Sequence, residues 1–209
     1  MKSLKQYILE NKLITFVVTF FDKWVRHWDN SQEQRFLLNK KERKDMIKFI
    51  ESQDKCNEIL YRATYLNYGN IENTPVGGTY YEPLISTSES ERFVNKILKQ
   101  NADYNIKSNK SDDNKLLTKL IIKPGSQSIN IDNFINYGQF EWVACGKFKV
   151  ISKKTETFKW ENDFTYKRYS TKINVITIEQ VFDESLTDIF EKLKPLKNNY
   201  KKEKQEIML

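Results

Sequence analysis

The feature of this chain that most constrains its fold is a change of pattern near residue 59. Beyond it, short runs of β-branched and aromatic residues are separated by turn sequences such as NYGN, PVGG and KPGS. These runs predict strands at 59–64, 80–86, 116–123, 141–151 and 173–182. A helix is predicted at 90–100, and the polar stretch QNADYNIKSNKSDDNK that follows is predicted to be a surface loop. Helices followed by strands without regular alternation are typical of an α+β domain.

The residues before this point are predicted to be helical. Leu13, Phe20, Trp24 and Trp28 lie on one stripe of 3.6-residue period. We interpret this aromatic stripe as a face that packs on the core, and a partner-binding or membrane-surface helix is the alternative. No membrane span is expected, because the apolar run at 13–21 is too short to cross a bilayer.

Capping signals place further helices before the strands. Ser31 and Gln34 form a Ser-x-x-Gln capping box, and Asn39 precedes the amphipathic stretch KKERKDMIKFIES. Near the other end of the chain, a last helix leads into a Lys-rich tail. We therefore divide the single expected domain into an N-terminal helical part at 1–55, a β core at 56–182, and a C-terminal helix with a basic tail at 183–209.

The composition favours an anionic partner. Thirty-five Lys and Arg residues against 28 Asp and Glu residues give a net charge of +7. The two cysteines, Cys56 and Cys145, lie far apart in the sequence, and His27 is the one histidine. Neither a disulfide framework nor a zinc site is therefore expected, and we expect a reducing, cytoplasmic setting.

A carboxylate opens the strand predicted at 141–151. Phe140, Trp142 and Ala144 alternate onto one face, so Glu141 shares the other face with small apolar residues. A glutamate in that position is either a cleft residue or a charge on an edge strand. The strand alone does not decide between the two.

Two other strands carry side chains that could share a cleft with this glutamate. Arg62 interrupts the strand LYRATY, and a planar guanidinium suits bidentate binding of a pyrophosphate. The next strand ends on the hydroxyls of Ser86, Thr87 and Ser88, which can orient a carboxylate or bind a ribose. The alternatives are an edge arginine and an ordinary strand exit or helix cap.

The order of these features resembles the arginine-serine-glutamate class of mono-ADP-ribosyltransferases. The segment QFEWVACGKFKVISK is similar to the corresponding strand of the T-even phage Mod and Alt transferases, and EILYRA is similar to their first strand. The resemblance covers about residues 40–182. It implies a split β-sandwich with N-terminal helices packed beside a cleft that binds NAD, which is the substrate, and it implies no metal.

The resemblance assigns five residues to NAD binding, namely Arg62, Ala63, Thr87, Ser88 and Phe93. Arg62 would bind the phosphates, and the backbone of Ala63 would face the nicotinamide amide. The family usually has glycine at the latter position, whereas alanine restricts φ. Phe93 is the next aromatic residue downstream that could stack on nicotinamide.

The resemblance also assigns the catalytic residues. Glu141 would stabilise the positive charge that develops on the ribose as nicotinamide leaves, in the way that glycosidase carboxylates stabilise a similar ion. Ser86 would orient Glu141, while Thr87 and Ser88 would support the NAD pocket.

Gln139, which we also count among the catalytic residues, and Tyr137 are predicted to contact the acceptor. Similar enzymes that modify arginine usually carry a glutamate two places before the catalytic one, and here the residue is the neutral Gln139. Its amide suits an asparagine side chain or the edge of a nucleobase, and Tyr137 could stack on a base or contact a protein. The alternative for Tyr137 is an exposed loop aromatic without a function.

These observations favour an NAD-dependent transferase of ADP-ribose, with a nucleobase in RNA or DNA as acceptor. One alternative is a transferase that modifies Asn or Arg of host proteins. An alternative of another class is a non-enzymatic basic module that binds RNA or protein. An active enzyme would poison its own cell, so we expect a toxin or a phage effector, with a neutralising partner that could bind the N-terminal aromatic helix.

Overall fold

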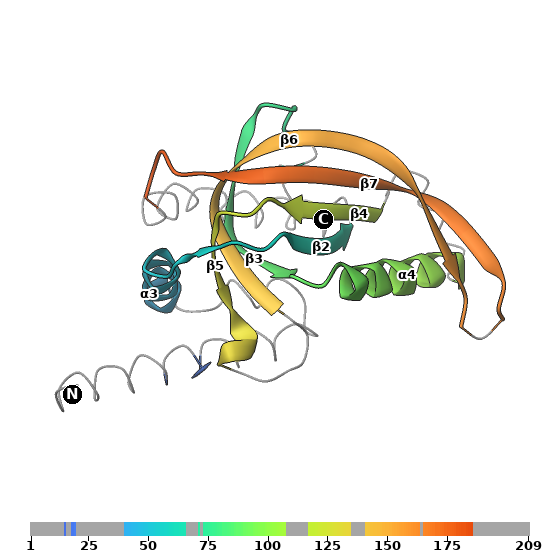
Figure 1. The fold of residues 1–209 in the computed structure, drawn as a ribbon, viewed down its shortest axis with the longest axis horizontal. Helices are drawn as coiled ribbons and strands as arrows, with labels where there is room; N and C mark the ends of the chain where they lie inside the picture. Colours follow the sequence, from blue (N-terminus) through green and yellow to red (C-terminus); the bar gives the residue numbers. More distant parts are fainter. Residues whose placement is uncertain are drawn as a thin grey trace, which may run out of the picture.

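The computed structural model describes residues 15, 18–19, 40–65, 71, 73–107, 117–134, 141–163 and 165–185 (Figure 1). In chain order the elements are α3 (Lys40–Glu51), β1 (Lys55–Cys56), β2 (Leu60–Tyr65), β3 (Thr79–Ser88), α4 (Glu91–Lys107), β4 (Leu117–Ile122), β5 (Ser126–Asn130), the 3-10 turn η1 (Ile131–Asn133), β6 (Glu141–Glu161) and β7 (Arg168–Val181). A mixed sheet forms the centre, so the predicted α+β class is confirmed. The predicted aromatic helix and the predicted C-terminal helix lie outside the described residues.

The sheet has the strand order β1-β5-β6-β3-β2-β4-β7, and β7 pairs again with β6. Five strands, β6, β3, β2, β4 and β7, therefore form a ring. All pairings are antiparallel except that of β4 with β7. The registered pairing of β2 with β3 is a single pair, Tyr61 with Ser88, so these two strands diverge and the ring is split between them.

Two apolar clusters hold this arrangement together. The larger cluster fills the ring with buried side chains from β2, β3, β4, β6 and β7, among them Leu60, Ile85, Leu120, Phe148 and Ile178. The smaller cluster joins Leu98 and Ala102 of α4 to Leu117, Trp160, Ile173 and Val175. Because burial of such side chains is the main favourable term in folding, α4 stays fixed against β4, β7 and the far part of β6.

The helix α3 is attached to β5 by a buried glutamine. Gln127 donates through Nε2 to the carbonyl of Ile50 at 2.9 Å and to those of Glu51 and Gln53. Ile50 and Glu51 are the last residues of α3, whose carbonyls need partners from outside the helix, and Gln53 lies in the turn that follows. The helix starts at Lys40, within the stretch KKERKDMIKFIES predicted to be helical, and Asn39 lies outside the described residues.

The structure corrects several predicted boundaries. The helix predicted at 90–100 continues to Lys107, so the first part of the predicted surface loop is helical. Buried Ala102 explains this, because it packs in the smaller cluster. The sequence did not predict β5, whose residues are mostly polar yet buried. It also predicted a shorter β6 and a shorter β7 than the 21 and 14 residues observed.

In the described part of the chain, no helix combines the length and the apolar composition that a bilayer-crossing segment needs.

Candidate active site

The structure links Arg62, Ser86 and Glu141 through hydrogen bonds. These residues lie on β2, β3 and β6, which are neighbours in the sheet although the residues are far apart in the sequence. The Ser86 hydroxyl donates to Glu141 Oε1 at 2.5 Å. Arg62 donates through Nη1 to the Ser86 carbonyl oxygen at 3.0 Å. A serine at the centre thus connects a guanidinium on one side with a carboxylate on the other.

Glu141 is the first residue of β6, and its side chain is only 7% exposed. It pairs in register with Ser88 of β3, and Val143 pairs with Ser86, so these four side chains lie on one face of the sheet. On the other side, β6 pairs with β5 through Trp142 and Asn130. Glu141 therefore is not a charge on an edge strand. A buried carboxylate requires hydrogen-bond donors, and Ser86 supplies one.

Arg62 also lies on an interior strand, because β2 is flanked by β3 and β4. Its backbone pairs with Leu120 of β4, and its side chain is half-buried. The guanidinium connects β2 with β3 close to the place where the two strands diverge. The edge-residue interpretation of this arginine is therefore wrong.

The three hydroxyl residues at the end of β3 make different contacts. Ser86 binds Glu141, whereas the buried Thr87 donates to the Trp142 carbonyl oxygen at 3.0 Å on the opposite face. Ser88 accepts from the backbone N–H of Ser90 at 3.1 Å and so shapes the turn into α4.

The turn after β3 ends in a helix cap. Ser90 precedes α4 and accepts from the N–H of Phe93 at 3.2 Å, as an N-cap serine does. The cap fixes the backbone of the half-buried Phe93 in the first turn of α4, close in the sequence to Ser88. Its stacking on nicotinamide stays a prediction.

The remaining predicted site residues are Ala63, Gln139 and Tyr137. Ala63 lies in β2 opposite Lys119 and packs at the edge of the smaller cluster. It is not among the described residues with positive φ, so this backbone position does not require glycine. Gln139 and Tyr137 lie outside the described residues.

Sequence reasoning missed two residues with polar contacts next to the site, and Glu89 is the first. Trp142 Nε1 donates to Glu89 Oε2 at 2.9 Å, which ties the residue after Glu141 to the residue after Ser88. This contact holds the ends of β3 and β6 together. Its sequence signal was weak, since Glu89 resembles any polar residue in a turn.

Lys119 is the second missed residue. It is buried on β4, its Nζ bonds to Glu91 and to Asn95 Oδ1, and it lies 5.6 Å from the centre of the Tyr61 ring. Burial, followed by the negative charge of Glu91, raises the pKa of Tyr61. These contacts join the start of α4 to β2 and β4. A lysine inside the apolar strand LTKLII was the signal that could have identified it.

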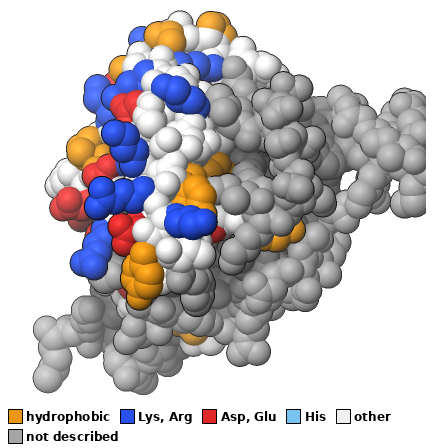
Figure 2. All heavy atoms as spheres, turned by 90° about the vertical axis from the view of Figure 1, so that its right-hand side faces the viewer, with side chains coloured by type: hydrophobic (Ala, Val, Ile, Leu, Met, Phe, Trp, Pro, Cys, Tyr) orange, Lys and Arg blue, Asp and Glu red, His pale blue; other side chains and the backbone are white. Residues whose placement is uncertain are grey.

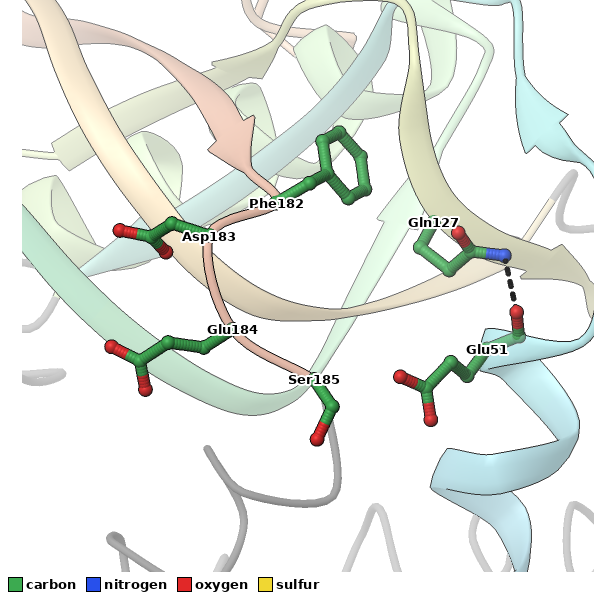
Figure 3. Close-up of a pocket in the computed structure, with 6 residues that line it drawn as sticks. All are labelled: Glu51, Gln127, Phe182, Asp183, Glu184 and Ser185. Atoms are coloured by element: carbon green, nitrogen blue, oxygen red, sulfur yellow. Dashed lines mark hydrogen bonds between the residues drawn. The ribbon is translucent and has the colours of Figure 1, made fainter.

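A shallow pocket of about 380 Å³ lies elsewhere (Figure 3). It is lined by Glu51, Gln127, Phe182, Asp183, Glu184 and Ser185, and none of Arg62, Ser86 or Glu141 is among these. Three carboxylates in its wall would repel a pyrophosphate. We therefore place the candidate site at the hydrogen-bonded residues and not in this pocket.

Both cysteines are free and buried. Burial raises the pKa of the Cys145 thiol and also that of the Cys56 thiol. A raised pKa keeps these thiols protonated, so neither has the thiolate character of a nucleophile.

The chain has no match among protein-family profiles or among curated proteins. Its fold is similar to solved structures of bacterial ADP-ribosyltransferases at low identity. Vis in complex with agmatine, from Vibrio splendidus, is 10% identical with a TM-score of 0.45, covering 83% of this chain and 70% of that chain. Plx2a, a toxin from Paenibacillus larvae, is 13% identical with a TM-score of 0.46, covering 81% of this chain and 85% of that chain. The catalytic domain of VahC from Aeromonas hydrophila is 14% identical with a TM-score of 0.40, covering 73% and 75%.

Proposed function

We propose that this protein is an NAD-dependent mono-ADP-ribosyltransferase that resembles the arginine-serine-glutamate class. The single observation that carries the proposal is the hydrogen-bonded connection of Arg62, Ser86 and Glu141 across three neighbouring strands. The sequence resemblance assigns roles to the same three residues. A structural module without activity would have no need to bury a carboxylate and bond it to a serine that an arginine also contacts.

The chemistry accounts for the buried carboxylate. In the reaction, the bond between ribose C1′ and the nicotinamide nitrogen breaks, and its electron pair leaves with nicotinamide. A bond from C1′ to the acceptor forms, and the acceptor loses a proton to solvent. Glu141 stabilises the positive charge on the ribose, which is greater in the transition state than in bound NAD. The Ser86 hydroxyl holds the carboxylate in one orientation.

Arg62 provides the complementary charge. Its fork suits a pyrophosphate, which carries negative charge on several oxygens. Arg62 donates to the carbonyl of Ser86, and Glu141 accepts from the hydroxyl of Ser86. The phosphate-binding group and the catalytic carboxylate therefore both contact the same residue. The binding energy gained at the phosphates can thus position the ribose against Glu141.

We further propose a nucleobase in RNA as the acceptor, within a Mod- and Alt-like subclass. The support is the neutral Gln139 two residues before Glu141 and the net charge of +7. The setting we propose is a phage or toxin effector that acts in the cytoplasm and is held in check by a neutralising partner. Asn or Arg of a host protein is the alternative acceptor.

The experiment incubates the full chain with labelled NAD and a whole-cell extract, and then treats parallel samples with RNase, DNase or protease. We expect RNase to remove the label. Label removed by protease alone would replace the RNA acceptor with a protein while keeping the transferase. Absence of both labelling and nicotinamide release would refute the transferase itself.

A further inference from the structure

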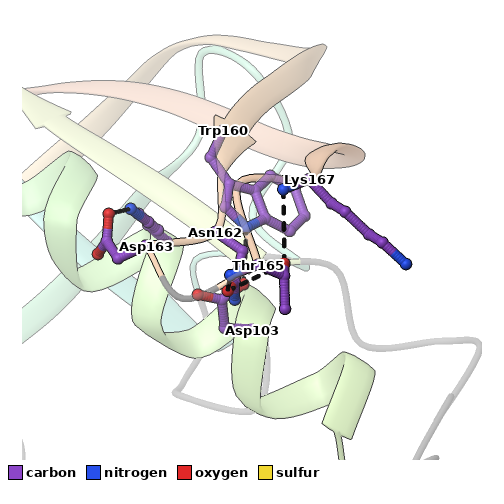
Figure 4. Close-up of polar contacts among 7 residues, drawn as sticks. Asp103, Trp160, Asn162, Asp163, Thr165 and Lys167 are labelled. Carbon is purple, nitrogen blue, oxygen red and sulfur yellow. Dashed lines mark hydrogen bonds and ion pairs between the residues drawn. The ribbon is translucent and has the colours of Figure 1, made fainter.

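The long strands β6 and β7 extend beyond the sheet as a two-stranded arm, residues 157–172, where β7 no longer pairs with β4. Its inner face is attached to α4. Trp160 stacks between Phe158 and Tyr169, with ring centroids 5.7 Å apart in both pairs. Trp160 Nε1 also donates to Asp103 Oδ1 of α4 at 2.8 Å (Figure 4). The arm is therefore a fixed platform.

The described residues of the turn at the end of the arm are held by hydrogen bonds and an ion pair. The buried Asn162 accepts from the N–H of Thr165 at 3.0 Å through its side chain, and its N–H donates to the Lys167 carbonyl at 3.0 Å (Figure 4). Lys99 of α4 forms an ion pair with Asp163 at 2.5 Å. Side chains displayed here are thus held in place relative to the sheet.

The outer face of the arm is polar and basic. Paired residues share a face, and those pointing away from α4 are Thr157, Lys159, Glu161, Arg168, Ser170 and Lys172. This set has three cationic side chains and one carboxylate, Glu161, which lies 3.6 Å from Arg168 Nε, and all of its members are exposed. Figure 2, which views the molecule from this end, shows Lys and Arg side chains gathered along one side with fewer acidic ones.

Tyr166 stands at the tip of the arm beside these cations. It is 76% exposed and has a φ of 53°, the one positive φ among the described residues other than glycine. Glycine would adopt this conformation without strain, whereas a tyrosine rarely does. An exposed ring held in a strained position between a buried asparagine turn and two basic residues points to a use for the ring.

We propose that the outer face of the arm, with Tyr166 at its tip, binds single-stranded RNA. As an acceptor-binding surface it deepens the proposed function and rests on it, while the binding itself does not depend on catalysis. Lys159, Lys172 and Arg168 bind phosphates, and the ring of Tyr166 stacks on an unpaired base.

Several features favour this partner over the alternatives. Successive side chains on one strand face are about 6.6 Å apart, a spacing similar to that of consecutive phosphates in an extended single strand. An exposed ring needs an unstacked base, which a duplex does not offer. The hydroxyls of Thr157 and Ser170 lie among the cations and can bond to the 2′-hydroxyl that distinguishes RNA from DNA. An acidic protein surface would pair with the cations, but it would not need the exposed ring and the hydroxyls beside them.

The first test compares two variants with equal loss of charge. Lys159→Gln/Lys172→Gln changes the arm, and Lys48→Gln/Lys123→Gln removes two cations from α3 and from the end of β4. Binding of a short fluorescent single-stranded RNA is followed by anisotropy at several salt concentrations. We expect the arm variant to weaken binding on the order of tenfold at low salt and to lower the salt slope by about 1.4, with little change in the control. Equal losses in the two variants would overturn the proposal, because net charge alone would then explain binding.

The second test addresses the ring and the identity of the partner. Tyr166→Gly removes the ring and relieves the strained φ, so we expect no loss of thermal stability but about 5- to 150-fold weaker RNA binding. Tyr166→Phe keeps the ring and should bind like wild type. Equal binding of DNA of the same sequence, or equally effective competition by an acidic peptide, would overturn the assignment to RNA.

The arm and the transferase can fail separately. Both arm variants should release nicotinamide from NAD as fast as wild type does, because no arm residue belongs to the candidate active site. RNA binding that depends on the arm in a protein without any NAD hydrolysis would leave the arm proposal standing and refute the transferase. Normal NAD hydrolysis with RNA binding unaffected by the arm variants would refute the arm alone.

Discussion

Replacement of Glu141 by glutamine tests the reaction at its centre. The substitution removes the charge but keeps the size of the side chain and one oxygen that can accept from the Ser86 hydroxyl. The side chain is 7% exposed, so the wild-type carboxylate is stabilised mainly by protein groups and not by water. A neutral amide avoids the cost of burying a charge, and we expect the melting temperature of Glu141→Gln to equal or exceed that of wild type.

The rate should fall far more than the stability changes. A group that stabilises charge only in the transition state contributes about 2.7–4 kcal/mol, which corresponds to about 10²- to 10³-fold in rate. We therefore expect a loss within that range in the rate of nicotinamide release, with affinity for NAD little changed.

The assay measures nicotinamide release by chromatography and NAD binding by calorimetry on the same preparations. Glu89→Gln is the matched control, since Glu89 is an exposed carboxylate that contacts the neighbouring Trp142. It should retain activity within about threefold of wild type, because it lies outside the charge-stabilising group. Activity of Glu141→Gln within that same margin would refute the catalytic assignment. A large drop in its melting temperature together with activity would indicate a structural role instead.

The remaining predictions concern the other residues of the candidate site and the buried Cys145. Arg62→Lys keeps the charge but loses the fork, so NAD binding should weaken markedly in calorimetry, and unchanged binding would remove Arg62 from the site. Ser86→Ala leaves the carboxylate without its donor, and we expect a loss of about 10- to 100-fold in nicotinamide release with NAD affinity retained; Ser86→Thr, which keeps the hydroxyl, should recover part of it. Gln139→Ala should suppress transfer to the acceptor while slow hydrolysis of NAD continues, and equal loss of both would show that Gln139 supports Glu141 or the fold. Cys145 should not react with a thiol reagent in the folded protein, because burial raises its pKa; rapid labelling without denaturant would contradict this.

The sequence predicted the central strands and the three linked residues because local and global signals agreed there. Arg62, Ser86 and Glu141 each stand out against an apolar strand, and such contrasts are visible without knowledge of the fold. The resemblance supplied their order. Only the structure could establish that β3 lies between β2 and β6 and so brings the three together.

Other parts escaped prediction because tertiary contacts decide them. The residues of β5 are polar, and Gln127 tolerates burial only because it bonds to the end of α3, a contact 77 positions apart in the sequence. The arm likewise has long polar stretches. Its strand structure depends on Trp160 and Tyr169 packing against α4, which is itself longer than predicted for the same reason.

The split between β2 and β3 connects the fold to the proposed chemistry. In a continuous sheet, the backbone groups of two neighbouring strands would bond to each other along their whole length. Here the registered pairing stops at Tyr61 and Ser88, and the side chain of Arg62 bonds across to the Ser86 carbonyl of β3. The Ser86 hydroxyl in turn binds Glu141. The group proposed to bind the NAD phosphates and the proposed catalytic carboxylate therefore both contact Ser86, and the strand pairings among β6, β3, β2, β4 and β7 hold them on either side of the split.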